Sequence, residues 1–442
     1  MLGVNHSLTS PNKAGTDALI RDYYFSRDKS LHQDIVHTRA SGATQVGSDG
    51  YIKWADHNML IRSNEFEHSD WISPARTTAN RAISPTGENN ASEITDSGAS
   101  ISDFVGNILS PICISIYAKK NTADYLRLSV GSPSSHCVNF DLNTGEAVEV
   151  LGTAVAHTAV DEGNGWWRLS ASFQEGSYMQ FSARTAVSGG SRTTGVYIYG
   201  AQLEHTFNVN SGPRPYIETT GSRIFKERFD YDKDGNSKGL LVEEARTNLQ
   251  TQAINLSGNY VNSDSSWVAD STVSPSGVKD ADRMYEGSDT SAYHRLSYTA
   301  STSANTLSFY AKKGAVRDWV YSYIWTGSAT SEYAFFNLVT GQVGTTSGVG
   351  ATGMEDVGNG WYRCWVYRTT TGYDTGRIGL SNADNAFTYD GDTSAYVSLW
   401  GIQEEAGLFP TSLIPTYGAT ATRAADTCKV DGTNFSRFYT EG

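Results

Sequence analysis

The stretch Asp161-Glu-Gly-Asn-Gly-Trp-Trp-Arg168 decides the fold, because it returns later in the chain as Asp356-Val-Gly-Asn-Gly-Trp-Tyr-Arg363. Four further blocks recur around it in the same order and at nearly the same spacing. They are Ile116-Tyr-Ala-Lys-Lys120 with Phe309-Tyr-Ala-Lys-Lys313, Phe140-Asp-Leu-Asn-Thr-Gly145 with Phe336-Asn-Leu-Val-Thr-Gly341, Val196-Tyr-Ile-Tyr-Gly-Ala-Gln202 with Val397-Ser-Leu-Trp-Gly-Ile-Gln403, and Pro213-Arg-Pro-Tyr-Ile217 with Pro410-Thr-Ser-Leu-Ile414. A collinear repeat this long indicates two copies of one domain, since solenoid repeats span about 20–50 residues.

The composition is typical of a β protein rich in turns. Of the 442 residues, 12% are aromatic, with 25 Tyr, while 43 are Gly and only 18% are charged. Aromatic residues favour strands and glycine favours tight turns. No apolar run approaches the length of a membrane span, so none is predicted. The first residues lack the basic and apolar pattern of a secretory signal.

The net charge argues against nucleic acid as a partner, and the cysteine pattern argues against a zinc site. The net charge is −13, which repels phosphate backbones and disfavours nucleic acid. The four cysteines, Cys113, Cys137, Cys364 and Cys428, fall at different positions in the two copies. We therefore expect free thiols, and their spacing fits no zinc site. Synthesis in a reducing cytoplasm follows as the simplest expectation.

Hydrophobic residues alternate with a period of two in both copies. Ile112, Ile114 and Ile116 share one strand face, and Leu307 and Phe309 take the matching face in the second copy. Such alternation indicates half-buried antiparallel strands, and no long window sustains a helical stripe. The sequence therefore predicts an all-β fold of two tandem antiparallel jelly-roll sandwiches with an N-terminal arm.

The repeat also sets the expected domain boundaries. Arg246-Thr-Asn-Leu249 resembles Asp56-His-Asn-Met59, and each marks the start of a copy. We expect an arm or attachment segment at 1–55, a first sandwich at 56–220, a β-hairpin linker at 221–246 and a second sandwich at 247–427. Residues 428–442 are then either a short tail or the start of a further β domain.

The Gly-Asn-Gly-Trp-x-Arg block favours architecture over chemistry. Asn-Gly forms a tight hairpin turn, the Trp begins a strand, and the Arg can stack on the ring or pair with an acid across the sheet. Both copies keep the block whole, as a turn that sets the register requires.

Four aromatic residues alternate in Asp318-Trp-Val-Tyr-Ser-Tyr-Ile-Trp325 of the second copy. Trp319, Tyr321, Tyr323 and Trp325 would share one strand face, which is either the interior of the sandwich or an exposed platform. Sugars stack their apolar faces on aromatic rings. These four residues are therefore the glycan-binding candidates.

Two acidic turns raise the question of calcium. Asp390 and Asp392 precede the last strand of the second copy and could hold a structural calcium, although the first copy has no carboxylate there. The turn Asp230-Tyr-Asp-Lys-Asp-Gly235 begins like an EF-hand loop, but Leu241 stands where the bidentate Glu is required. We predict a plain hairpin turn with its tip at Asp234-Gly235, and no other cofactor.

No pattern of a catalytic site is present. The nine His residues show no metal-protease spacing, and there is no Gly-x-Ser-x-Gly elbow. The acid pairs Glu243-Glu244 and Glu404-Glu405 would face opposite sides of a strand, which does not suit two acids flanking one bond. The sequence therefore predicts a protein that is not an enzyme.

Several blocks together resemble bacteriophage virion proteins of the tail-fibre or head-fibre type, which carry tandem carbohydrate-binding-module-like jelly rolls. The blocks are Leu240-Leu-Val-Glu-Glu-Ala-Arg-Thr-Asn-Leu249, Gly163-Asn-Gly-Trp-Trp-Arg168, Val397-Ser-Leu-Trp-Gly-Ile-Gln-Glu404, Thr38-Arg-Ala-Ser41 and Thr422-Arg-Ala-Ala-Asp426. The resemblance covers roughly residues 36 to 440.

The resemblance implies a structural protein of a virion fibre, spike or collar, made in the host cytoplasm. Its implied partners are other virion proteins, further copies of itself in a homo-oligomer, often a trimer, and a host-surface glycan. Two alternatives stay open. One is a purely structural virion adaptor without glycan binding, and the other is a non-catalytic module of a polysaccharide-degrading enzyme.

Overall fold

The computed structural model describes residues 31, 35–96, 101–108, 110–131, 136–152, 154–174, 176–184, 191–207, 210, 212–257, 260–301, 303–325, 331–369 and 375–429. The chain divides into two compact units. The first unit is Trp54–Lys226, and the second unit combines Met1–Lys53 with Glu227–Gly442. Most of the expected arm, and the tail beyond its first two residues, lie outside the described residues.

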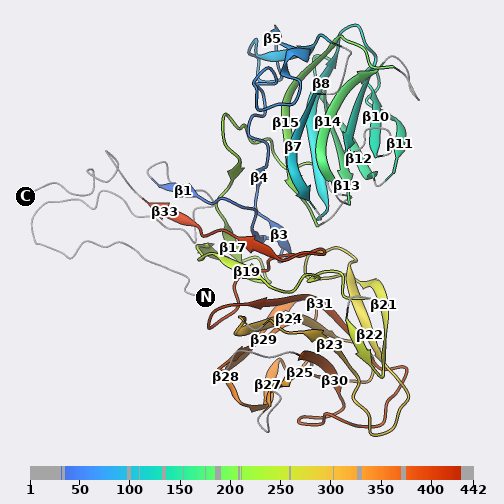
Figure 1. Cartoon of the computed structure of the whole chain (residues 1–442), viewed down its shortest axis with the longest axis vertical. Coiled ribbons are helices and arrows are strands. Elements are labelled where there is room, and N and C mark those ends of the chain that lie inside the picture. Colours follow the sequence, from blue (N-terminus) through green and yellow to red (C-terminus); the bar gives the residue numbers. More distant parts are fainter. Residues whose placement is uncertain are drawn as a thin grey trace, which may run out of the picture. The chain divides into compact units, whose positions relative to one another are not determined.

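The first unit is a sandwich of two antiparallel sheets (Figure 1). Its five-stranded sheet has the order β11 (Ala147–Leu151), β10 (Cys137–Asp141), β9 (Tyr125–Val130), β14 (Gly176–Arg184) and β7 (Ile101–Ile108). Its six-stranded sheet has the order β12 (Ala154–Gly163), β13 (Trp166–Phe173), β8 (Ile112–Lys120), β15 (Val196–His205), β6 (Ala91–Ile94) and β5 (Thr77–Ala82). The short strands β4 (His57–Asn58) and β16 (Ile224–Phe225) pair with each other, so the first and last segments of this unit lie side by side.

The second unit repeats this arrangement. One sheet has the order β20 (Val261–Ser263), β23 (Arg295–Thr299), β30 (Thr375–Ser381), β25 (Trp319–Trp325), β26 (Glu332–Asn337) and β27 (Gln342–Ser347). The other has the order β21 (Ser265–Thr272), β22 (Ala281–Glu286), β31 (Tyr396–Glu405), β24 (Thr306–Lys313), β29 (Trp361–Arg368) and β28 (Val349–Gly358). The prediction of an all-β fold with two tandem sandwiches is confirmed.

Helical structure in the described residues is limited to one 3-10 turn, η1 (Pro74–Arg76). None of the described segments forms a helix of the length and apolarity that a membrane crossing requires. Each sandwich has its own hydrophobic core between its two sheets, built by the alternating residues of the central strands. Ile114, Ile116 and Leu169 fill the first core, and Leu307 and Phe309 take the matching places in the second.

The repeated Gly-Asn-Gly-Trp-x-Arg block has the same structural role in both units. Asn164 and Asn359 adopt φ values of 52° and 54°, and the glycine after each has φ 77°. Two successive positive φ values form the hairpin turn that Asn-Gly favours. The block therefore closes β12–β13 in one unit and β28–β29 in the other.

The Trp and Arg of this block are structural as well. The Trp166 indole donates to the Ile83 carbonyl at 3.0 Å, and the Trp361 indole donates to the Val273 carbonyl at 2.9 Å. Each Arg stacks on a tyrosine of the neighbouring strand, with 5.4 Å between the Arg168 guanidinium and the Tyr117 ring. The stacking partner is thus a tyrosine and not the Trp beside the Arg.

Asn58 and Asn248 are the paired residues that mark the start of each copy. The Asn248 amide donates to the carbonyls of Ile402 and Ile414, and its oxygen accepts from the backbone of Gln250 and Glu404. Asn58 makes the matching four bonds in the first unit. Both side chains are fully buried, so each asparagine fastens the entering chain to the last long strand of its sandwich.

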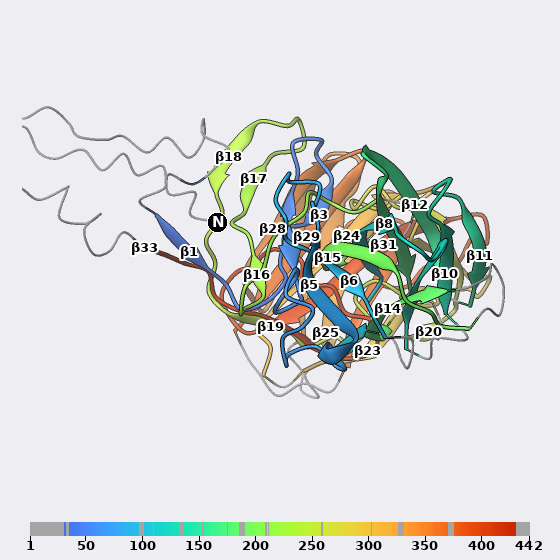
Figure 2. The ribbon, with the colours of Figure 1, turned by 90° about the horizontal axis from the view of Figure 1, so that it is seen from above.

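Residues 36–53, expected as part of an arm, contribute short strands to the second unit. β1 (Val36–Thr38) pairs with β33 (Thr427–Lys429), and Figures 1 and 2 show these two strands side by side. The other small pairs of this unit are β2 (Thr44–Val46) with β3 (Ile52–Trp54), β17 (Phe229–Tyr231) with β18 (Ser237–Leu240), and β19 (Arg246–Asn248) with β32 (Ala421–Arg423).

A buried charge cluster holds these short strands together. The Asp426 carboxylate accepts from Arg39 at 2.7 Å and from Arg228, and it also pairs with His37. Arg228 extends the cluster to Glu243 at 2.8 Å. Burial by itself raises the pKa of Asp426. The hydrogen bond with His37 and the charges of Arg228 and Arg39 lower this pKa by more, so the net pKa lies below its usual range and the carboxyl stays ionised.

Candidate functional site

The four aromatic residues of β25 lie on the outer face of their sheet. Val320 and Ile324, which alternate with them, belong to the core of the second sandwich. Successive strand residues point to opposite faces, so Trp319, Tyr321 and Tyr323 point away from the core together with Trp325. The register places Tyr321 beside Phe335 and Tyr323 beside Tyr333, both on β26.

These side chains and those near them on the outer side of the sheet make up what we call the aromatic face: Trp319, Tyr321, Tyr323, Trp325, Tyr333, Phe335 and Phe387. Phe387 lies in the loop between β30 and β31, and its ring centre is 4.8–5.4 Å from those of Tyr321, Tyr323, Tyr333 and Phe335. Tyr321 and Phe335 are completely buried beneath this loop. Burial raises the pKa of Tyr321 to about 12, so its ring is neutral at physiological pH.

The other end of the aromatic face is open. Trp325 is 47% exposed, and Tyr323 and Tyr333 are half-buried. The Arg377 guanidinium lies 5.3 Å from the centre of the Tyr323 ring and 5.9 Å from that of Trp325. The half of the aromatic face under Phe387 is therefore packed inside the protein. The half around Trp325 presents its rings and the Arg377 guanidinium to solvent.

A glycine on the neighbouring strand makes room for the buried rings of the aromatic face. Gly379 on β30 lies directly opposite Tyr321 in the register. A Cβ at this position would come within 2.4 Å of the tyrosine ring. The missing side chain lets the Tyr321 ring lie across the neighbouring strand, under Phe387.

The first unit carries different chemistry on the same face. Arg127 on β9 and Asn139 on β10 are register partners, as Tyr321 and Phe335 are in the second unit. The Arg127 guanidinium donates to Asn139 at 2.8 Å and to Glu149 at 2.6 Å. An aromatic surface at this place is therefore a property of the second unit and not of the fold.

Asp390 and Asp392 engage local donors in the structure. The Asp390 carboxylate accepts from the Ser291 backbone at 3.0 Å. The Asp392 carboxylate accepts from the Ser394 backbone at 2.9 Å and from its hydroxyl at 2.6 Å, and the hydroxyl bond lowers the pKa of Asp392. Across the described ranges, no group of three or more His, Cys, Asp or Glu residues is placed to hold a metal ion.

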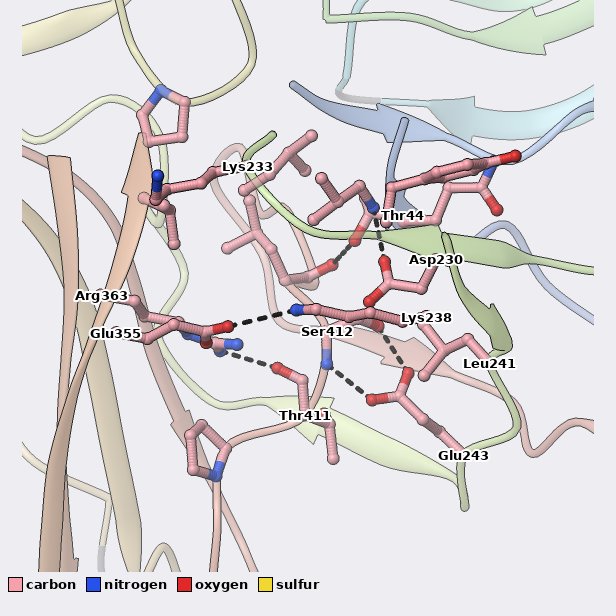
Figure 3. Close-up of a pocket in the computed structure, with 18 of the residues that line it drawn as sticks. Thr44, Asp230, Lys233, Lys238, Leu241, Glu243, Glu355, Arg363, Thr411 and Ser412 are labelled. Atoms are coloured by element: carbon pink, nitrogen blue, oxygen red, sulfur yellow. Dashed lines mark hydrogen bonds and ion pairs between the residues drawn. The ribbon is translucent and has the colours of Figure 1, made fainter. Parts of the chain in front are cut away.

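A cavity of about 560 Å³ lies within the second unit. Figure 3 shows Glu355 and Arg363 on one side of it and Asp230 and Lys238 on the other. The first two come from β28 and β29 of the sandwich, and the other two come from the hairpin β17–β18. That hairpin is the predicted turn: the Asp232 carboxylate caps it by accepting from the backbones of Asp234 and Asn236.

The charged groups of the cavity bind one another. The Lys238 ammonium is 3.3 Å from Glu355, and Arg363 donates to the Thr411 carbonyl at 2.7 Å. The Glu243 carboxylate accepts from the Ser412 backbone at 2.8 Å (Figure 3). Asp230 accepts from the Val46 backbone at 2.8 Å, and burial raises its pKa. Because these groups have partners, the cavity ranks below the aromatic face as a binding site.

The sequence analysis missed two cationic residues beside the aromatic face, Arg295 on β23 and Arg377 on β30. Alternation within Thr375-Gly-Arg-Ile-Gly-Leu-Ser381 shows that Arg377 points away from Ile378 and Leu380, which are core residues. The alternation does not show that β30 pairs with β25, which brings Arg377 beside Tyr323.

Comparison with known proteins adds little to this geometry. No protein-family model matches the sequence, and no curated protein matches it. Among solved structures, the chain is similar to the N-terminal CBM22-1–CBM22-2 tandem domain from Paenibacillus barcinonensis Xyn10C. The identity is 14% and the TM-score 0.24, over 80% of this chain and 98% of that chain. A likeness at this TM-score carries no argument about function.

Proposed function

We propose that this chain is a non-enzymatic glycan-binding protein and that the aromatic face of the second unit holds the sugar. The exposed Trp325, flanked by the half-buried Tyr323 and by Arg377, is the observation that carries the proposal. A pyranose ring stacks its C–H face on such a ring and hydrogen-bonds its hydroxyls to polar neighbours. The packed half of the face, under Phe387, holds the exposed rings in place.

The proposal includes a place for the protein in a phage virion, as part of a fibre, spike or collar. The repeated sequence blocks that resemble virion proteins support this setting. Two tandem sandwiches are compatible with a structural component of the virion that also contacts the host surface. Homo-oligomerisation, as in a trimer, belongs to the same proposal, and an electron-microscopy map of the assembled particle tests both.

The test of glycan binding uses the full chain on a glycan array, followed by calorimetry on the best ligand. Trp325→Ala is expected to weaken binding about tenfold or more, the size of an aromatic anchor at an interface. The thermal midpoint should stay unchanged, because nearly half of the Trp325 surface is exposed.

Phe409→Ala is the matched control. Phe409 is 44% exposed and lines the cavity instead of the aromatic face. Loss of binding in this variant but not in Trp325→Ala would move the sugar site to the cavity. A chain that binds no glycan would favour the purely structural adaptor. Detectable hydrolysis of a bound polysaccharide would contradict the non-enzymatic assignment.

A further inference from the structure

Two arginines share the outer side of the sheet with the aromatic face. Arg377 is the register partner of Tyr323 on one side and of Ser297 on the other. Arg295 is the partner of Gly379, one step further along the same face. The two guanidinium groups are therefore diagonal neighbours on adjacent strands. We call them the arginine pair.

Aromatic rings hold the arginine pair. The Arg295 guanidinium lies 3.9 Å from the centre of the Tyr293 ring, which is 40% exposed. Arg377 lies over Tyr323 and Trp325. Stacking keeps a guanidinium plane in a fixed orientation while its N–H edge stays available to a ligand.

The arginine pair has no counter-ion among the described residues. Neither guanidinium forms an ion pair with a carboxylate there, and the Nε of each is buried without a hydrogen-bond partner. Two other arginines of the second unit do have a carboxylate partner: Arg317 pairs with Glu286, and Arg368 pairs with Glu404. Burial, and then the neighbouring charge of Arg295, lower the pKa of Arg377.

Two like charges side by side in a partly dry environment disfavour each other unless an anion joins them. A carboxylate or sulfate matches the fork of N–H donors on a guanidinium, and such charge-assisted bonds are among the stronger polar contacts. The rings beside the pair supply a stacking surface for the sugar that carries the anion. The unpaired charge and the stacking surface therefore select the same kind of ligand.

We propose that the aromatic face and the arginine pair together bind an anionic sugar, one that carries a carboxylate or sulfate group, with its ring on Trp325 and Tyr323 and its anion on Arg295 and Arg377. This inference rests on the proposed glycan binding and adds the charge of the sugar. The net charge of −13 does not oppose it at short range, because salt screens distant charges beyond about 8 Å at physiological ionic strength. It does oppose a long phosphate backbone.

The test compares polymers that differ in charge alone. The full chain is titrated with polygalacturonate and its fully methyl-esterified form, with polysialic acid and its methyl ester, and with dextran sulfate and dextran. At least one anionic polymer is expected to bind about tenfold or more tightly than its neutral partner. The carboxylate and sulfate arms distinguish the two anions.

Arg377→Gln and Arg295→Gln should each remove most of that preference and flatten the salt dependence of binding. Arg283→Gln is the matched control, because Arg283 also stacks on a tyrosine, Tyr396, but belongs to the other sheet. Unchanged thermal midpoints show that the variants fold.

The outcomes separate the two proposals. If the neutral polymers bind as tightly as the anionic ones and Arg377→Gln has no effect, while Trp325→Ala still weakens binding, the anionic site is wrong and glycan binding stands. If no polymer binds and the array is also blank, both fail. Binding of a single-stranded oligonucleotide in preference to every sugar would overturn the anionic-sugar site as well.

Discussion

At the scale of single residues, the repeated sequence marks side chains that fasten the fold. Asn58 and Asn248 make the same four bonds in their own units. Each is fully buried and lies where the chain enters its sandwich. Removing such a side chain leaves several buried backbone groups without partners, and each of those costs about 1–3 kcal/mol.

Asn248→Ala is therefore expected to lower the free energy of unfolding of the second unit by more than about 2 kcal/mol. Denaturant unfolding followed by tryptophan fluorescence measures the change. Asn236→Ala is the control, because Asn236 is exposed at the tip of the β17–β18 hairpin. Equal effects of the two substitutions would contradict the role given to Asn248.

The carboxylate of Asp426 makes stability depend on pH. Its pKa is lowered in the folded chain, so its stabilising contribution is complete above its unfolded pKa of about 3.9 and is lost as the pH falls below that value. Asp426→Asn should cost about 3 kcal/mol at pH 7, because Arg39 and Arg228 lose their buried partner.

The measurement is the thermal midpoint of wild type and Asp426→Asn between pH 7 and pH 3. The difference between them should shrink toward the acid end, because the Asp426 carboxyl of the unfolded chain becomes protonated there while that of the folded chain, with its lowered pKa, stays ionised. Asp234→Asn serves as the control, since that carboxylate is exposed. A difference that stays constant over the whole range would show that Asp426 does not act through its charge.

At the scale of elements, corresponding strands of the two units carry two kinds of outer surface. β9 and β25 occupy the same place in their sheets, and both bury aliphatic side chains on the core side. Their outer sides differ, with Arg127 in one and Tyr321 in the other. Core packing therefore fixes one face of the strand and leaves the other free to carry a binding surface.

Gly379→Ala tests how the aromatic face is assembled. The added methyl would overlap the Tyr321 ring, so this ring and Phe387 above it must shift, at a cost of about 1–3 kcal/mol in the free energy of unfolding. Near-ultraviolet circular dichroism should report the altered ring packing. Gly212→Ala is the comparison, because a Cβ there meets only ordinary contacts. Equal stability of the two variants would contradict this account.

At the scale of the whole molecule, each sandwich has its own core, and the chain's early and late segments meet in the second unit. Residues before the first sandwich supply β1 and Arg39, while β33 and Asp426 come from the other end of the chain. Thr44 also donates to the Leu413 carbonyl. The second unit is therefore completed by residues that precede the first unit in sequence.

Deleting residues 1–53 is expected to destabilise the second unit by about 3–5 kcal/mol, the cost of breaking a buried ion pair. The first unit, which begins at Trp54, should keep its unfolding transition. Differential scanning calorimetry of the shortened and full chains measures both. A shift of the first unit's transition alone would show that the segment belongs there instead.

The sequence by itself determined the strands, the two-fold repeat and the turns. Alternation of apolar residues and the Asn-Gly pairs are local signals, and the local backbone obeys them. It also identified β25 as the aromatic strand, but left open whether its rings faced the core. Only the tertiary structure decided that, because the answer depends on which side of the strand meets the second sheet.

Tertiary structure also decided which residues share the site. Arg295, Arg377 and Phe387 are separated in sequence from Trp325, and they join it because β23, β30 and β25 are hydrogen-bonded neighbours. Strand order depends on long-range pairing, which no local pattern encodes. The same reason explains why residues 36–53, with no signal beyond short strands and turns, complete the second unit: their partners lie at the far end of the chain.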